Sequence, residues 1–386
     1  MNIKLYNKIA KVGTDVFDRT KYSVGAEVEN PDAIMVRSAA LHELSFNPEL
    51  RAISRCGAGV NNIPIDRCTD SGIAVFNTPG ANANGVKELA IAALLLASRD
   101  IVGGVNWAST LAGAPEGVAK AVEAGKSAFA GNEISGKTLG VIGLGAIGGM
   151  VANIAINLGM NVVGCDPYIS VAGAWALSRA VKQAATYDDI YKTADYITLH
   201  VPAAASTKGM INRDAIAKMK DGVKLINLSR ADIVNIADVK EALASGKISA
   251  YITDFPTEES INVKGITAIP HLGASTAESE DNCAVMAAHE LIDYLELGNI
   301  RNSVNFPNVS LPASNSPRVA VMHKNIPALL SKLTTVISDA KINIANLANG
   351  SKGENAYTLI ETDAPLEASA LDKLSEIDGV IRVLSY

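Results

Sequence analysis

Short apolar runs alternate with helical stretches along most of the chain. In the first hundred residues, four apolar runs predict buried strands at residues 2–5, 33–36, 52–54 and 74–76. Residues 86–98 are almost wholly apolar and predict a helix that is buried against another domain or subunit. Strands that alternate with helices are typical of an α/β domain with a parallel sheet.

The same alternation continues through the middle of the chain. Apolar runs predict further strands at residues 138–142, 160–164, 196–201, 224–228, 251–253 and 267–269. Ser275 and Glu278 have the spacing of a capping box, which predicts a long helix that ends at Gly298.

Three glycines follow the strand at 138–142 with the spacing G-x-G-x-x-G: Gly143, Gly145 and Gly148. A strand before them and a helix after them match a turn that lets a pyrophosphate approach the backbone at a helix N-terminus. Asp166 lies just past the next strand, where its carboxylate would accept hydrogen bonds from a ribose diol and repel a 2′-phosphate. We therefore expect NAD rather than NADP; the alternative is a glycine-rich turn that binds nothing.

The C-terminal part has a different composition and element order. Residues 305–317 contain three prolines and many Asn and Ser residues, which is typical of a linker. Beyond them, strands at 318–322, 342–348, 356–361 and 380–384 and helices at 327–338 and 368–377 predict the order βαββαβ of a ferredoxin-like domain.

Polar residues follow several predicted strands. Arg230, Glu258 and His271 each lie just past a strand end. Ligands of open α/β sheets bind outside the carboxyl ends of the strands, so these three side chains are candidates for one crevice. Singly, each is also explained as an ordinary loop or surface residue. The Gly57-Ala58-Gly59 turn fits either an anion-binding nest or an ordinary turn.

Composition narrows the class of protein. The 386 residues are 48% hydrophobic and 19% charged, which indicates a globular protein of two or three domains. The net charge of -6 implies no attraction to nucleic acid or to an anionic membrane, and no apolar run is long enough for a membrane span. The four cysteines show no paired or metal-binding spacing, and no secretion signal is present. We therefore expect no metal and a cytoplasmic protein.

Several motifs together resemble the D-2-hydroxyacid dehydrogenase family, in the branch that carries a C-terminal ACT regulatory domain. The motifs are Cys56 to Asn61, Asn77 to Asn84, Gly143 to Gly148, Leu199 to Pro202, Asn227 to Arg230, Phe255 to Glu258 and Pro270 to Gly273.

The resemblance implies an α/β fold with two Rossmann-like domains, a flavodoxin-like substrate domain and a doubly wound NAD domain, plus a ferredoxin-like ACT domain. The implied boundaries are 1–97 with 285–304 for substrate, 98–284 for NAD, 305–317 for the linker and 318–386 for the ACT domain.

The catalytic Arg-Glu-His set of this family falls on Arg230, Glu258 and His271. A His suits removal of a hydroxyl proton, and a carboxylate beside it stabilises the imidazolium. A guanidinium holds a substrate carboxylate through two hydrogen bonds. The implied reaction is NAD-dependent oxidation of 3-phospho-D-glycerate to 3-phosphohydroxypyruvate, the first step of L-serine biosynthesis.

The resemblance also implies binding residues. For the cofactor these are Gly143, Gly145, Ala146, Ile147, Gly148, Asp166, His200, Val201, Pro202, Thr207, Ser229, Asp254, His271 and Gly273. For the substrate they are Arg37, Ser38, Gly57, Ala58, Gly59, Asn82 and Arg230.

Some positions depart from the family pattern. One residue is missing before Phe255, so either Thr253 or Asp254 contacts the nicotinamide amide. A second arginine that is common near Arg37 is replaced by alanine, and Lys8 or a residue of a partner subunit would have to supply its charge.

The C-terminal domain carries residues that suggest regulation. His323, Asn325 and Asn343 match positions with which ACT domains of this branch hold L-serine, so we expect a homodimer or homotetramer inhibited by L-serine. One alternative is a dehydrogenase for another D-2-hydroxyacid, such as lactate or glyoxylate/hydroxypyruvate. Another is a non-catalytic sensor of NADH or of an amino acid.

Overall fold

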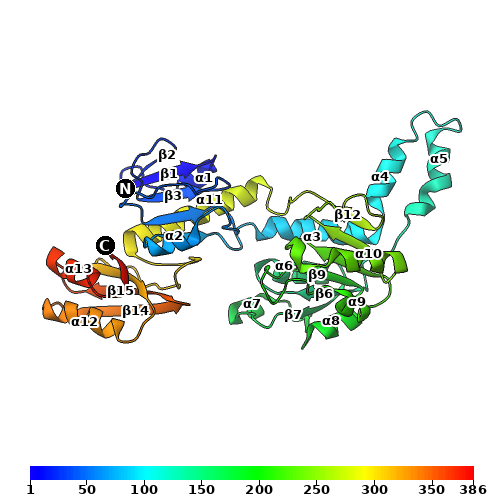
Figure 1. Ribbon diagram of the computed structural model, residues 1–386. Helices are drawn as coiled ribbons and strands as arrows, with labels where there is room; N and C mark the ends of the chain where they lie inside the picture. The colour runs from blue at the N-terminus through cyan, green and yellow to red at the C-terminus, as the bar shows by residue number, and fades with distance from the viewer. The chain divides into compact units, whose positions relative to one another are not determined.

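The computed structural model describes residues 1–386 (Figure 1). Contacts divide the chain into two units. One unit consists of Met1–Asn82 together with Ala277–Tyr386, and the other is Ala83–Thr276. No helix combines the length and the apolar character that crossing a membrane requires. The domain boundaries inferred from the sequence stay a prediction.

The first unit begins with a five-stranded parallel sheet. Its strands are β1 (Asn2–Tyr6), β2 (Ser23–Gly25), β3 (Ala33–Val36), β4 (Ala52–Arg55) and β5 (Ala74–Asn77). Their order β2-β1-β3-β4-β5 is the flavodoxin-like order that we expected. The four strands expected from apolar runs are confirmed. β2 was not predicted because its three residues at the sheet edge include one apolar side chain.

Three helices accompany this sheet: α1 (Lys11–Thr14), α2 (Ile65–Asp70) and α11 (Ala277–Leu297). α11 lies against α1 and β4. A Cβ atom at Gly13 would lie 2.4 Å from Ala284, so this close approach needs a glycine. The predicted end of α11 at Gly298 is confirmed by a left-handed φ of 71°. The capping box predicted at Ser275 and Glu278 is wrong, because α11 begins at Ala277, two residues after Ser275. The Oγ of Ser275 donates to the backbone oxygen of His271.

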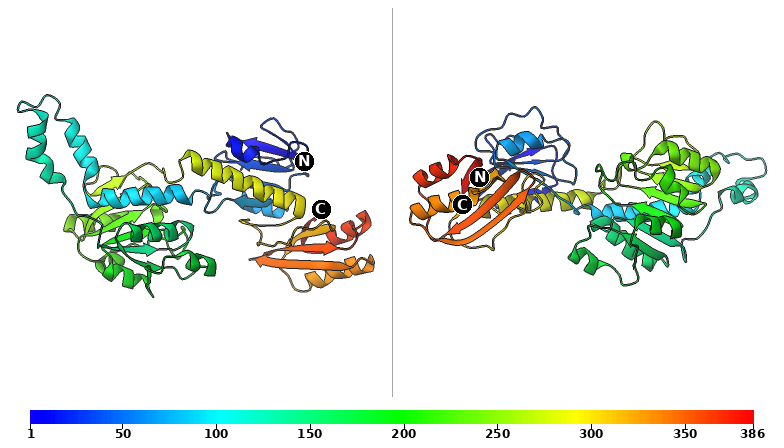
Figure 2. Two further views of the ribbon diagram at one scale, coloured as in Figure 1. Left: turned by 180° about the vertical axis from the view of Figure 1, so that it is seen from behind. Right: turned by 60° about the horizontal axis from the view of Figure 1, so that its bottom comes forward.

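The C-terminal segment of this unit forms a four-stranded antiparallel sheet. The strands are β13 (Arg318–Lys324), β14 (Ile344–Lys352), β15 (Asn355–Thr362) and β16 (Val380–Ser385), in the order β14-β15-β13-β16. Helices α12 (Leu329–Asp339) and α13 (Ala368–Ser375) lie together on one face (Figure 2). The predicted ferredoxin-like order βαββαβ is confirmed.

The other face of this sheet packs against the N-terminal sheet and α11. One buried cluster contains Phe76, Tyr294, Phe306 and Tyr357 from both parts. Tyr357 also donates to the backbone oxygen of Gly298 over 2.6 Å. Phe306 belongs to the segment with linker composition, which is therefore packed into the unit rather than extended between two bodies.

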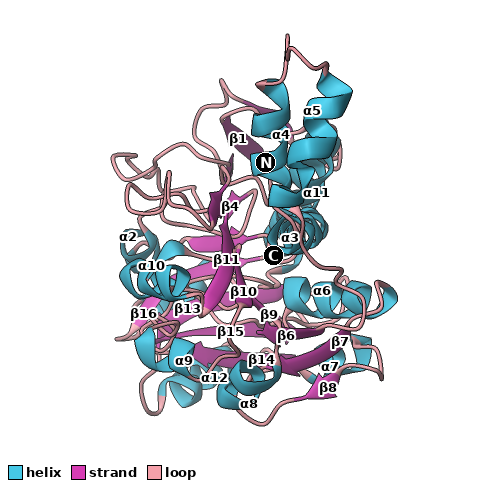
Figure 3. Ribbon diagram, turned by 90° about the vertical axis from the view of Figure 1, so that its right-hand side faces the viewer, coloured by secondary structure: helices cyan, strands magenta, loops and turns pink.

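The second unit is built on a seven-stranded parallel sheet. Its strands are β6 (Thr138–Ile142), β7 (Asn161–Cys165), β8 (Lys182–Gln183), β9 (Tyr196–Leu199), β10 (Val223–Asn227), β11 (Ile248–Thr253) and β12 (Ile266–Ala268). The order β12-β11-β10-β9-β6-β7-β8 is that of a doubly wound sheet, and β10, β9, β6 and β7 follow one another in Figure 3.

Helices cover both faces of this sheet. They are α3 (Ala83–Ser98), α6 (Ala146–Asn157), α7 (Val171–Ala176), α8 (Tyr187–Thr193), α9 (Arg213–Ala217) and α10 (Ile236–Ser245), with a short 3-10 turn at Ala231–Ile233. Helices α4 (Ile101–Ser109) and α5 (Val118–Gly125) both contact a 3-10 turn at Lys126–Phe129 and project away from the sheet (Figure 1). Side chains of α3 and α6 form one core with the sheet, and side chains of α8, α9 and α10 form the other. One face of the apolar stretch in α3 is therefore buried within this unit, whereas Leu95 on the same helix is 45% exposed.

Candidate active site

The glycine turn between β6 and α6 has the backbone geometry that its spacing predicts. Gly143 has a left-handed φ of 89°, and a Cβ there would lie 2.4 Å from the backbone oxygen of His200. A Cβ at Gly148 would lie 1.9 Å from the oxygen of Gly143. A Cβ at Gly145 would meet nothing within 4 Å, and no side chain caps the helix that begins at Ala146. Open space before an uncapped helix N-terminus fits a pyrophosphate.

Asp166 follows β7 and is tied to this turn. One carboxylate oxygen accepts a hydrogen bond of 2.8 Å from the backbone N–H of Leu144. The other accepts one of 2.8 Å from the N–H of Tyr168. Each carboxylate oxygen can accept further hydrogen bonds, so a ribose diol remains an acceptable partner.

His200 follows β9 and packs against the same turn. Its Nε2 lies 3.0 Å from Thr198 Oγ1, and its Nδ1 is buried without a partner. Burial lowers the pKa of His200 to about 4, so the ring is neutral at pH 7. A nucleotide bound at the glycine turn would therefore lie beside an uncharged imidazole ring.

Polar side chains fix the loops next to His200. Val201 and Pro202 begin the loop after β9, and Thr207 Oγ1 donates to the backbone oxygen of Pro202 over 2.6 Å. Ser229 Oγ donates to the oxygen of Leu199 over 2.6 Å, which joins the end of β10 to the end of β9.

The aromatic ring of Phe255 brings together two of the predicted catalytic residues. The His271 ring lies 4.6 Å from the Phe255 ring, centroid to centroid. Arg230 Cζ lies 5.7 Å from the same ring, and Arg230 Nη1 donates to the backbone oxygen of Ser229 over 2.7 Å. Arg230 and His271 are both exposed, so their polar atoms are accessible to a substrate.

Asp254 lies at the end of β11 and is 1% exposed. Burial raises the pKa of its carboxyl group, and the nearby His271 opposes this shift. Its Oδ1 has no hydrogen-bond partner, while the backbone of Gly273 hydrogen-bonds to the carboxylate. Thr253, the other candidate for the nicotinamide contact, already accepts a hydrogen bond from the N–H of Phe255.

The predicted acid Glu258 is not brought to His271. It is exposed in the turn between Thr257 and Ser260 and makes no hydrogen bond or ion pair. The carboxylate that interacts electrostatically with His271 in this structure is that of Asp254.

In the first unit, the predicted substrate residues gather at the carboxyl ends of β3, β4 and β5. Arg37 follows β3, and its Nη2 lies 2.5 Å from Glu280 Oε1. The N–H of Ser38 donates to Asn7 Oδ1 over 2.9 Å. Asn82 ends the loop after β5, directly before α3, and its side chain makes no hydrogen bond.

The Gly57-Ala58-Gly59 turn follows β4. Gly57 has a φ of 144°, and its oxygen accepts from the N–H of Thr78 over 3.1 Å. Asn77 Nδ2 donates to the oxygen of Ala58 over 2.6 Å. The turn is therefore fixed by the loop after β5.

Arg55 is a cation that the sequence reasoning missed. Its Nε donates to the backbone oxygen of Arg37 over 3.1 Å. A Cβ at Gly57 would lie 1.5 Å from Arg55 Nη1, so the guanidinium lies over the glycine turn. The rule that selected Arg230, a polar residue at the end of a strand, would also have selected Arg55. Arg55 is the last residue of β4 and lies just before the glycine turn.

The three predicted regulatory residues do not form one site within a single chain. His323 is 3% exposed, and its two ring nitrogens lie 2.8 Å from the oxygen of Lys324 and from Thr358 Oγ1. Asn325 follows the end of β13, and Asn343 precedes β14. The register of both strands against β15 places these two residues at opposite ends of the sheet.

Residues 106–275 match the family model of the D-isomer specific 2-hydroxyacid dehydrogenase NAD binding domain. D-3-phosphoglycerate dehydrogenase of Haemophilus influenzae is 33% identical over 350 residues, which cover 87% of this chain and 81% of the relative. The enzyme of that name from Escherichia coli K12 is 34% identical over 86% of this chain and 81% of its own length.

Solved structures show the same fold. The NAD⁺-bound 3-phosphoglycerate dehydrogenase of Entamoeba histolytica has a TM-score of 0.60 and 26% identity, and the match covers 79% of this chain and 98% of that chain. A D-2-hydroxyisocaproate dehydrogenase has a TM-score of 0.65 at 20% identity, with 79% and 100% covered.

Proposed function

Because the chain belongs to the D-isomer specific 2-hydroxyacid dehydrogenase family, we propose that it oxidises 3-phospho-D-glycerate to 3-phosphohydroxypyruvate with NAD. The observation that carries this proposal is the meeting of Arg230 and His271 at the ring of Phe255, beside the buried Asp254. The reaction would supply L-serine biosynthesis.

The proposed roles of the residues follow from their chemistry. His271 removes the proton of the substrate C2 hydroxyl as a general base. Arg230 binds the substrate carboxylate through its guanidinium fork and holds C2 beside that base. NAD, when bound, supplies the acceptor for the hydride that leaves C2. Glu258 is the proposed partner of the imidazolium by its match to the family pattern, and Asp254 is the carboxylate that interacts electrostatically with His271 here.

Cofactor binding is assigned to the strand ends of the second unit. Gly143, Gly145, Ala146, Ile147 and Gly148 form the proposed pyrophosphate site, and Asp166 the ribose site. We assign the nicotinamide amide to Asp254 rather than Thr253, because Asp254 has a buried oxygen without a partner. His200, Val201, Pro202, Thr207, Ser229, His271 and Gly273 complete the proposed site.

The phosphate of the substrate is assigned to the first unit. Arg37 and Ser38 are the proposed contacts, and Arg55 supplies the second cation that alanine at positions 39 and 40 removes. Gly57, Ala58, Gly59 and Asn82 are the remaining proposed substrate residues.

The test is NADH formation, followed by absorbance, on addition of 3-phospho-D-glycerate, D-glycerate or D-lactate to the purified protein. We expect the phosphorylated acid to give the highest kcat/KM. Turnover of the unphosphorylated acids alone would favour the second candidate, a dehydrogenase for another D-2-hydroxyacid. The ion pair of Arg37 with Glu280 favours that candidate, because it partly neutralises Arg37. Binding of the nucleotide without turnover of any acid would instead indicate a non-catalytic sensor.

We also propose that the C-terminal sheet is an ACT domain that binds L-serine between two chains. Asn325 and Asn343 lie at opposite ends of one sheet, so a single site that uses both needs a second copy of the chain. β14 is an edge strand with exposed residues such as Leu347, which suits pairing in a homodimer or homotetramer.

Titration of NADH production with L-serine tests this site. Inhibition that weakens in Asn325→Ala and Asn343→Ala is expected. Inhibition that survives both substitutions would place the serine site elsewhere.

The proposal also includes the domain boundaries and the cellular location. The domain boundaries are 1–97 with 285–304, 98–284 and 318–386, joined by 305–317. A cytoplasmic location is supported by four cysteines that are all unpaired.

A further inference from the structure

A groove of about 600 Å³ lies in the first unit where three distant segments meet. Its walls are the end of β5 at Asn77, the segment from Asn302 to Asn308, and the end of β14 at Lys352. The segments are in close contact, because a Cβ at Gly350 would lie 3.1 Å from Pro307. The groove is therefore a junction of the N-terminal sheet and the C-terminal sheet.

The groove is lined by one cation and no carboxylate. Lys352 Nζ donates to the backbone oxygen of Ser303 over 3.0 Å and forms no ion pair. An ammonium group has three N–H donors, so two of them are left for a ligand. The side chain of Lys352 is exposed along part of its surface, and partial burial in the groove lowers its pKa.

Further hydrogen-bond groups line the same groove. The side chains of Asn308 and Ser351 make no hydrogen bond within the chain. One cation beside an amide and a hydroxyl suits a single carboxylate on a hydroxylated carbon chain. A phosphate dianion would require more positive charge than one lysine supplies.

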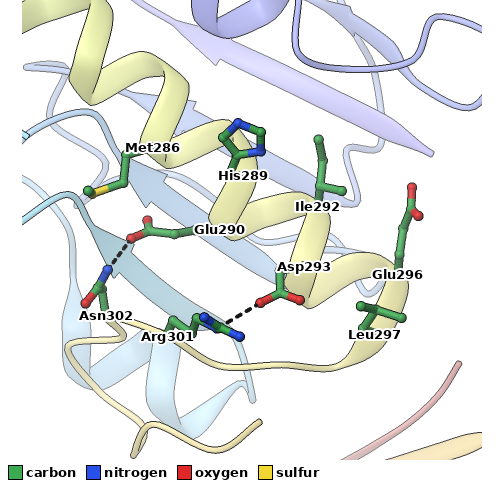
Figure 4. A pocket seen from close by; sticks show the side chains of 9 residues that line it. All are labelled: Met286, His289, Glu290, Ile292, Asp293, Glu296, Leu297, Arg301 and Asn302. Carbon is green, nitrogen blue, oxygen red and sulfur yellow. Dashed lines mark hydrogen bonds and ion pairs between the residues drawn. The ribbon is translucent and has the colours of Figure 1, made fainter. Parts of the chain in front are cut away.

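We propose that this groove is a binding site for a small hydroxylated carboxylate, held by Lys352, Asn308 and Ser351. The site is distinct from the dehydrogenase site and does not depend on the proposed function. One wall is shared with the substrate region, because Asn77 also donates to Ala58 in the glycine turn. A second pocket on α11 shares Asn302 with the groove (Figure 4), but there Asn302 is bound to Glu290.

Acylation of individual lysines in the full-length protein, followed by mass spectrometry, tests the site without requiring activity. D-glycerate is the probe, and Lys341, an exposed lysine that does not line the groove, is the internal control. We expect D-glycerate to slow acylation of Lys352 by about twofold at its dissociation constant and by about tenfold at ten times that concentration, with Lys341 unchanged.

Three outcomes would overturn the proposal. One is an acylation rate of Lys352 that D-glycerate does not change at millimolar concentrations. Another is equal slowing of Lys352 and Lys341, which would be a general salt effect. The third is protection by inorganic phosphate at the same ionic strength but not by D-glycerate. Double substitution Asn308→Ala with Ser351→Ala should weaken the protection, and full protection in that variant would contradict the assigned donors.

Discussion

Asn302 donates a hydrogen bond of 2.8 Å to the carboxyl group of Glu290, on the wall of a pocket beside α11 (Figure 4). Ser54 provides a second, longer contact of 3.5 Å to the same carboxyl group. Glu290 is 7% exposed, and burial raises its pKa to about 8. The folded protein therefore holds Glu290 protonated at neutral pH.

Because Glu290 is protonated in the folded protein, we expect the stability of the protein to depend on pH. Between the ordinary carboxyl pKa of 4.5 and about 8, the folded state keeps a proton that the unfolded chain has released. The proton on Glu290 stabilises the folded state fully at low pH. As pH rises through this window, the free energy of unfolding decreases by up to about 1.4 kcal/mol per pH unit. Glu290→Gln keeps an acceptor for Asn302 and should flatten this part of the melting-temperature profile. Exposed Glu49→Gln is the control and should not.

A second prediction concerns cofactor choice and Asp166. Its carboxylate already accepts two backbone hydrogen bonds and would repel a 2′-phosphate. NAD should therefore be preferred over NADP in kcat/KM. Asp166→Ala should reduce that preference by about tenfold or more, as expected for losing a hydrogen bond to a charged group. Equal efficiency with both cofactors in the wild type would contradict the role of Asp166.

Most of the fold could be predicted from the sequence because local signals agree with the tertiary structure. Apolar runs of three or more residues mark the central strands, and Gly298 marks the end of α11. β2 and β8 were missed because they are short, lie at sheet edges and have exposed positions. The segment 305–317 was read as a linker from its prolines, although Phe306 and Val309 anchor it in a core.

The candidate site could be predicted less completely. Strand ends located Arg230 and His271 correctly at one edge of the sheet, because parallel strands end on the same side. The conformation of the turn that carries Glu258 depends on a local hydrogen bond between Thr257 and Ser260, which no strand-end rule gives. Likewise, the position of Arg55 beside Arg37 depends on strand register, which was not known before the sheet order.

The third prediction tests the general base. His271→Ala should lower kcat with 3-phospho-D-glycerate by about 10²–10⁴-fold, the usual effect of removing a positioned base. His289, an exposed histidine on α11 in the other unit, gives the control His289→Ala, which should leave kcat unchanged. Wild-type turnover in His271→Ala would remove this residue from the mechanism.

A fourth prediction separates the roles of two carboxylates, Asp254, which interacts with His271 in this structure, and Glu258, which matches the family pattern. Asp254→Ala removes the proposed acceptor of the nicotinamide amide, so KM for NAD should rise by about tenfold or more. Glu258→Gln should instead lower kcat and leave KM for NAD near its wild-type value. The reverse pattern would exchange the two roles, since Asp254 is the carboxylate that interacts with His271 in this structure.

The last prediction concerns recognition of the phosphate by the two neighbouring arginines. Arg55 Nε contacts the backbone of Arg37, while the Arg37 guanidinium is paired with Glu280. Loss of a hydrogen bond to a charged group changes affinity by about 10- to 100-fold, so Arg37→Ala and Arg55→Ala should each raise KM for 3-phospho-D-glycerate by that factor. KM for D-glycerate, which lacks the phosphate, should change little, and exposed Arg301→Ala should affect neither substrate.

Glu280→Gln provides the opposite change, because it releases Arg37 from its ion pair. KM for the phosphorylated substrate should then fall, while KM for D-glycerate stays constant. If the arginine substitutions raise KM for both substrates equally, neither arginine binds the phosphate. The ion pair with Glu280 is then a structural contact between the end of β3 and α11.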